Sequence, residues 1–90
     1  MSARAVELVV HGRVQGVFFR DTCRAEAQRA GVAGWVRNEP DGTVRARLEG
    51  DEQAVDRVLA WVEKGPQHAE VHRVDVDEVA PTGLDGFQVL

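Results

Sequence analysis

The sequence contains a single cysteine, Cys23, which therefore has no partner for an internal disulfide. It has no apolar run near the ~20 residues that a membrane-spanning helix needs, and its first residues lack the basic, apolar and small-residue pattern of a secretory signal. A membrane protein and a disulfide-rich secreted protein are thus not expected, and a cytoplasmic location is predicted. The 90 residues provide for one compact domain, expected over residues 1–90.

Positive charge is also scarce. The 11 lysines and arginines are outnumbered by 15 acidic residues, which gives a formal net charge of −4. General binding to nucleic acids depends on basic residues that neutralise phosphates, so this balance argues against such a function. A local basic site for one small anion is still compatible with the sequence.

Hydrophobic periodicity divides the chain into strands and helices. Alternating apolar residues predict strands, and apolar residues that recur every three to four positions predict amphipathic helices. The predicted order is a strand over 4–11, a helix from Phe19 that ends at Gly31, strands over 34–38 and 43–49, a helix from an Asp51 cap to Lys64, a strand over 71–79 and a short strand over 87–90. Two amphipathic helices need an apolar surface, so both are expected on one face of a single sheet.

The alternation also assigns side chains to the core or to the surface. The residues predicted to face inward are Val44, Ala46 and Leu48 of the third strand and Val74 and Val76 of the fourth, with Phe19, Trp35 and Phe87 also in the core. Thr43, Arg45, Arg47 and Glu49 are predicted to face outward. A right-handed crossover through the first helix makes the first two strands parallel, so their ends lie at the same edge of the sheet.

The most informative stretch runs from Gly12 to Arg20 and joins the first strand to the first helix. Its glycines, Gly12 and Gly16, permit positive φ or a close approach to a ligand, so that consecutive N–H groups can face an anion. The helix adds its own unpaired N–H groups and the positive end of its dipole. Arg20 falls in the first turn, where a cation costs up to ~1 kcal/mol unless an anion is bound. The stretch therefore predicts a phosphate-binding loop.

Two motifs, GRVQGVFFR at positions 12–20 and GWVRN at 34–38 followed by DGTV at 41–44, resemble those of the acylphosphatases. The similarity extends over nearly the whole chain. It implies an α+β, ferredoxin-like βαββαβ sandwich, with an antiparallel sheet of four strands, a short additional C-terminal strand and two helices on one face. It also implies a monomeric enzyme without a cofactor that hydrolyses the carboxyl–phosphate anhydride bond of an acyl phosphate without a metal.

The resemblance carries roles to particular residues. By position, Arg20 binds the phosphate and Asn38 orients the attacking water. The main-chain N–H groups expected to hold the phosphoryl oxygens are those of Gln15, Gly16, Val17, Phe18 and Phe19. Gly12 and Thr43 are expected to have supporting roles, and the Thr43 hydroxyl is expected to help the turn before the third strand. Inorganic phosphate or sulfate is expected to compete for the same site.

Other residues are predicted to have no part in the chemistry. Cys23 lies on the apolar stripe of the first helix and is expected to be a small core residue. The histidines are far apart in the sequence and lack the spacing of metal ligands, so no metal site is predicted.

Some alternatives stay open at this point. By itself, Arg20 is typical of a solvated arginine at a helix start, and Asn38 is typical of a turn before Pro40. RNA-recognition domains share this order of elements, but the outward positions of the first and third strands hold no aromatic residue on which a base could stack. Hydrogenase-maturation proteins begin with a similar domain that handles carbamoyl phosphate.

The physiological acyl phosphate is also open. By resemblance, the candidates are 1,3-bisphosphoglycerate, carbamoyl phosphate and acetyl phosphate. The chain ends in Val89-Leu90, where many relatives have a basic residue followed by an aromatic one, and this difference bears on the packing of the last strand.

Overall fold

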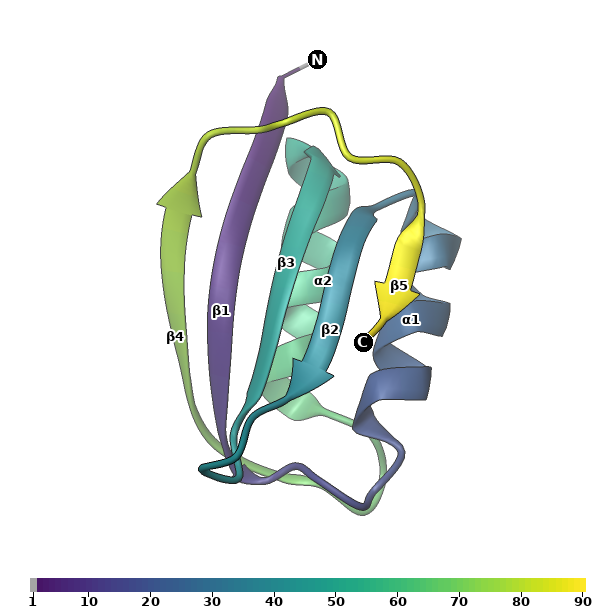
Figure 1. Cartoon of the computed structure of the whole chain (residues 1–90). Helices are drawn as coiled ribbons and strands as arrows, with labels where there is room; N and C mark the ends of the chain where they lie inside the picture. Colours follow the sequence, from purple (N-terminus) through teal and green to yellow (C-terminus); the bar gives the residue numbers. More distant parts are fainter. Residues whose placement is uncertain (1) are drawn as a thin grey trace.

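The computed structural model describes residues 2–90. Its elements are β1 (Ala3–Arg13), α1 (Phe19–Ala30), β2 (Ala33–Asn38), β3 (Val44–Asp51), α2 (Glu52–Lys64), β4 (Glu70–Val79) and β5 (Phe87–Val89). The sheet has the spatial order β4-β1-β3-β2-β5. The pairs β1–β3, β1–β4 and β2–β3 are antiparallel, and β5 adds to β2 in parallel. With both helices on one face (Figure 1), this is the predicted ferredoxin-like sandwich.

The sheet brings three chain segments to one edge. β1 and β2 are both antiparallel to β3, so they run in the same direction, and α1 is the crossover between them. Figure 1 shows the loop after β1 and the end of β2 at the same end of the molecule. The turn from β2 to β3 lies there too, and the predicted meeting of these segments is confirmed.

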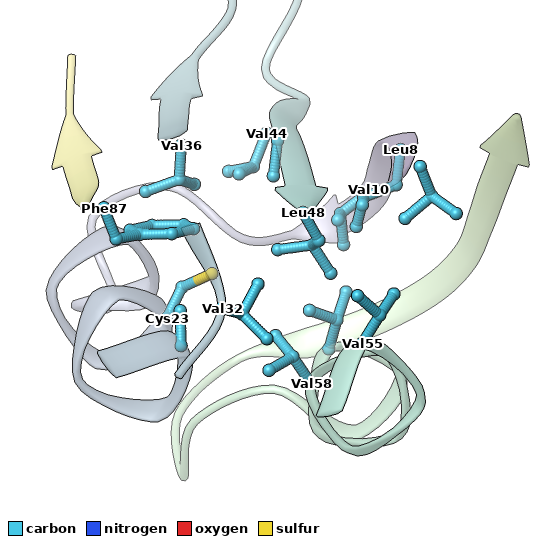
Figure 2. Close-up of a cluster of buried hydrophobic side chains, with 14 of the residues drawn as sticks. Leu8, Val10, Cys23, Val32, Val36, Val44, Leu48, Val55, Val58 and Phe87 are labelled. Carbon is cyan, nitrogen blue, oxygen red and sulfur yellow. The ribbon is translucent and has the colours of Figure 1, made fainter. Parts of the chain in front are cut away.

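The core lies between the sheet and the two helices. Figure 2 shows valine and leucine side chains from the strands packed above Cys23 of α1 and above Val55 and Val58 of α2. Cys23, Val36 and Val55 are fully buried, and Phe87 of the short last strand closes the same cluster. The predicted inward face of β3 and the assignment of Cys23 to the core are confirmed.

The ends of the helices differ in how closely they follow the prediction. α1 ends as expected, with Gly31 in the left-handed region (φ 75°) and its N–H donating to Gln28. Asp51 does occupy the N-cap position of α2, but its side chain makes no capping hydrogen bond there. The first N–H of the helix, that of Glu52, donates instead to the carbonyl of Ser2 at the start of the chain.

One assignment of a side chain to the core was wrong, and three other side chains face as predicted but differ from the usual burial of such positions. Trp35 is on the outer face of β2, half-buried, with the Arg37 guanidinium 4.9 Å from its ring centroid. Val76 pairs with Leu8 but remains 42% exposed, because β4 is an edge strand. Arg47 and Glu49 point outward yet are buried beneath residues 80–84, which accept from Arg47 and donate to Glu49.

In the part of the chain that the structure describes, no helix has the length and apolar character needed to cross a membrane.

Candidate active site

A cleft with a volume of about 330 Å³ opens at the edge where β1 and β2 end. Its lining comes from the loop after β1, the first turn of α1, the end of β2 and the last strand. The lining residues are Val14, Gly16, Phe18, Phe19, Arg20, Asp21, Asn38 and Val89. The structure thus brings Arg20 and Asn38, which are 18 positions apart in the sequence, to one cavity.

The loop between β1 and α1 has the backbone geometry of an anion-binding nest. Gly16 (φ 74°) and Phe18 (φ 62°) are in the left-handed region, and Val17 between them is not. Alternation in the sign of φ along successive residues turns their N–H groups toward one concave side. Among residues 2–90, no main-chain N–H from Gln15 to Phe19 donates to a protein acceptor. These donors are available to an anion.

The first turn of α1 fixes the position of the Arg20 backbone. Both the N–H and the hydroxyl of Thr22 donate to the carbonyl of Phe18, at 3.1 and 2.8 Å, and they hold the loop at the helix start. Arg20 follows two residues later in the lining of the cleft, and its Nη1 donates to the main-chain oxygen of Leu90 at 3.3 Å. The guanidinium has further N–H donors with which to bind a planar or tetrahedral anion.

Asn38 is the last residue of β2, opposite Val44 in the ladder with β3. Its side chain lines the cleft and makes no hydrogen bond with any other described residue. An amide side chain has an oxygen that accepts and an NH₂ group that donates. Asn38 can therefore accept a hydrogen bond from a water while it donates to a ligand.

Gln15 has a role that the sequence did not indicate. Its side-chain NH₂ group donates to the carbonyls of Glu39 and Thr43, at 2.8 and 2.9 Å. Both acceptors belong to the turn that follows Asn38, so Gln15 ties the anion loop to this turn. The sequence placed Gln15 in the loop, but no signal within it identified two carbonyls more than 20 positions away.

Thr43 shapes the same turn. Its hydroxyl and its N–H both donate to Oδ1 of Asp41, at 2.6 and 3.0 Å. The hydrogen bond from the Thr43 hydroxyl, and to a smaller extent the one from its N–H, lowers the pKa of the Asp41 carboxyl. The expectation that the hydroxyl helps the turn is confirmed. Thr43, Gln15 and Val17 are not among the residues that line the cleft.

Gly12 lies within β1 and not in the loop, because pairing with β4 extends this strand by two residues past its predicted end. The ladder with β4 shifts register between His11 and Gly12. A Cβ atom at Gly12 would be 2.0 Å from the carbonyl oxygen of Glu70. The glycine is therefore required by the approach of β4, and it does not line the cleft.

Two other kinds of group, metal ligands and nucleophiles, bear on the chemistry. Residues 2–90 contain no group of three or more His, Cys, Asp or Glu side chains that could hold a metal ion. Cys23 is buried in the core, and burial, assisted by the charge of Glu26, raises the pKa of its thiol to about 12. The thiol stays protonated at neutral pH and is unsuited to nucleophilic attack.

Solved structures define the class of this protein. An acylphosphatase from Coxiella burnetii superimposes with a TM-score of 0.94 and 31% identity, covering 98% of this chain and 93% of that one. An acylphosphatase from Bacillus subtilis gives 0.93 and 34%, covering 97% and 98%. The protein is thus a hydrolase of the ferredoxin-like fold.

The family model described as Acylphosphatase matches residues 6–89. An acylphosphatase of Rubrobacter xylanophilus is 53% identical over 87 residues, which are 96% of this chain and 79% of that protein. The chain belongs to the acylphosphatase family.

Proposed function

We propose that this chain hydrolyses an acyl phosphate to a carboxylate and inorganic phosphate by direct attack of water on phosphorus. The observation that carries the proposal is that one cleft brings together an anion nest, Arg20 and the unpaired side-chain amide of Asn38. Membership of the acylphosphatase family supports the reaction type. The individual roles below are inferred from the geometry of the cleft.

The phosphoryl group is held by the loop and by Arg20. The main-chain N–H groups from Gln15 to Phe19 donate to its oxygens, and the Arg20 guanidinium donates to two oxygens at once. Both sets of donors are in position before the substrate binds, so they stabilise the charge that shifts during transfer without reorganising. Arg20 keeps the 3.3 Å hydrogen bond from its Nη1 to Leu90 and makes these contacts with its other N–H donors.

Asn38 holds the attacking water. Its amide oxygen accepts a hydrogen bond from this water and so aims the water oxygen at phosphorus. A neutral amide is a poor base, so the water proton passes to an oxygen of the phosphoryl group. The new P–O bond forms as the bond between phosphorus and the acyl oxygen breaks, and the acyl group leaves as a carboxylate with the electron pair.

The leaving group explains why so few side chains suffice. A carboxylate is a weak base and departs without protonation by a general acid. Positioning and charge stabilisation are then the main requirements, and the loop and Arg20 supply both. We therefore propose that the reaction needs no metal ion, that inorganic phosphate and sulfate compete with the substrate, and that residues 1–90 act as a monomeric domain.

Steady-state hydrolysis of benzoyl phosphate with excess EDTA tests this function. Arg20→Gln is expected to lower kcat/KM by ~10³-fold, in the range found when a charged donor to a phosphoryl group is removed. Arg24→Gln is the matched control, because Arg24 is one turn further along α1, exposed and outside the cleft lining. Circular dichroism establishes that both variants are folded.

Two results would contradict the proposal. A loss smaller than tenfold in Arg20→Gln would remove Arg20 from the assigned role. Turnover that EDTA abolishes and added Mg²⁺ restores would show that the reaction needs a metal.

A further inference from the structure

The cleft is larger than a phosphoryl group. Its volume is about 330 Å³, and a water molecule in the liquid occupies about 30 Å³, so the space corresponds to about ten waters. A phosphoryl group has four non-hydrogen atoms besides the bridging oxygen and fills less than half of it. The rest of the cleft is open to the acyl part of the substrate.

One wall of this remaining space is an unusually exposed aromatic ring. Phe18 lines the cleft and is 77% exposed, the largest fraction among the exposed large apolar side chains of residues 2–90. The others are Val76, Leu84 and Leu90, and none of these lines the cleft. An isolated exposed apolar residue needs no explanation, but one held at the mouth of a binding cleft is a candidate ligand contact.

The backbone holds the Phe18 ring in this place at a cost. Its φ of 62° makes it the one residue other than glycine with positive φ among those described. A bulky side chain in this region is a true outlier, and such strain persists where surrounding contacts enforce it. Two hydrogen bonds from Thr22 hold the Phe18 carbonyl at the start of α1. The ring is therefore held outward, exposed to solvent, instead of collapsing onto the core.

The rest of the lining adds a second apolar contact and a charge. Val89 comes from β5 and is half-buried, and Val14 is buried beneath the loop. The two charged residues in the lining are Arg20 and Asp21. With Arg20 bound to the phosphoryl group, a second anionic group on the substrate would meet the carboxylate of Asp21, which is exposed, so the repulsion is modest and is screened by salt.

We propose that this cleft selects acyl phosphates whose acyl group is aromatic or branched aliphatic and carries no further negative charge. Phe18 and Val89 contact the acyl group, and Asp21 disfavours an acyl group that bears a second phosphate. This inference rests on the proposed function, since it requires that the loop and Arg20 hold the phosphoryl group.

The test compares three substrates in the full chain. Acetyl phosphate serves as the reference, benzoyl phosphate reports the apolar contact, and 1,3-bisphosphoglycerate reports the effect of a second phosphate. Acetate and benzoate are leaving groups of similar basicity, so the ratio of their kcat/KM values reflects binding of the acyl group. Because each variant is referred to its own rate with acetyl phosphate, any general damage to the loop cancels.

Phe18→Ala is expected to lower the ratio of benzoyl to acetyl phosphate about tenfold, and Phe18→Leu is expected to restore most of it. Leu84→Ala removes an exposed apolar side chain outside the cleft and should leave the ratio unchanged. Asp21→Asn is expected to raise the ratio of 1,3-bisphosphoglycerate to acetyl phosphate about fivefold at low salt, with a smaller increase at high salt. Ratios that stay within twofold in Phe18→Ala and Asp21→Asn would overturn the inference.

A binding measurement separates this inference from the proposed function. Benzoylphosphonate and acetylphosphonate lack the oxygen whose bond to phosphorus is broken, so calorimetric titration compares them without turnover. Tighter binding of benzoylphosphonate that is lost in Phe18→Ala supports the acyl site even if no substrate is hydrolysed, in which case the proposed function alone fails. Equal affinities of the two phosphonates in the wild-type protein would overturn the inference, whatever the rate of hydrolysis.

Discussion

At the scale of single residues, Gln15 shows how one side chain couples two parts of a site. The loop that carries Gln15 follows β1, whereas its two acceptors, the carbonyls of Glu39 and Thr43, follow β2. Asn38 immediately precedes Glu39. The position of Asn38 relative to the anion nest therefore depends on hydrogen bonds made by Gln15, a residue that need not touch the substrate with its side chain.

Gln15→Ala is expected to lower kcat about tenfold, because misplacing a positioned group by a fraction of an ångström weakens its effect. It should also cost about 1–2 kcal/mol of stability, since two partly buried carbonyls lose their donor. The main-chain N–H of residue 15 persists, so the inhibition constant for phosphate should change less than threefold. Gln28→Ala is the control, as Gln28 is exposed on α1. A large rise in the phosphate inhibition constant with kcat unchanged would contradict this positioning role.

The sequence predicted some residues of the site better than others. Arg20 stands in the motif that follows β1 and Asn38 in the motif that ends β2, at one edge of the sheet, and both line the cleft. The side-chain partners of Gln15 are long-range contacts, which local pattern does not encode. Trp35 was wrongly assigned to the core because a large aromatic is usually buried, while its partner on the outer face is the Arg37 guanidinium.

At the scale of elements, the C-terminal connector (residues 80–86) crosses the sheet at the end away from the cleft and leads into β5 (Figure 1). Glu49 of β3 anchors it. The carboxylate accepts hydrogen bonds from the N–H groups of Gly83, Thr82 and Leu84, at 2.5, 2.9 and 3.2 Å, and from Arg47. The alternation of β3 predicted that Glu49 faces outward but gave no sign that a distant segment covers it.

The charge of Glu49 is stabilised in this position. Burial by itself would raise the pKa of Glu49, but the N–H groups of the connector and the Arg47 side chain outweigh burial and lower the pKa below its ordinary value of 4.5. A pKa that is lower in the folded protein contributes stability above pH 4.5. This contribution is lost as the pH falls from 4.5 through the lowered pKa, because the folded carboxylate then becomes protonated.

Glu49→Gln is expected to lower the free energy of unfolding by about 2 kcal/mol at pH 7, since Arg47 keeps its second partner, Glu7, but loses the buried one. For a domain of this size the melting temperature should fall by about 10 °C. The difference from the wild-type protein should shrink as the pH falls below 4.5. Thermal unfolding at pH 7 and pH 3, with Glu63→Gln of α2 as the exposed control, checks this. An equal difference at both pH values would mean that the charge of Glu49 does not matter.

At the scale of the whole molecule, the fold assembles the site from segments that are far apart in the sequence. The crossover through α1 makes β1 and β2 parallel, so the anion nest and Asn38 reach the same edge. This arrangement was predictable, because the order of elements and the handedness of crossovers leave few alternatives. The burial of the outer face of β3 was not, since it depends on where an irregular segment passes.

The central claim is that the nest and Arg20 bind the phosphoryl group while Asn38 acts on the water. The most direct test measures kcat with benzoyl phosphate and the inhibition constant for inorganic phosphate in the wild-type protein and in Asn38→Ala. We predict that kcat falls by ~10²-fold or more while the inhibition constant for phosphate stays within about twofold. An inhibition constant that rises as much as kcat falls would contradict the claim and make Asn38 a phosphate ligand.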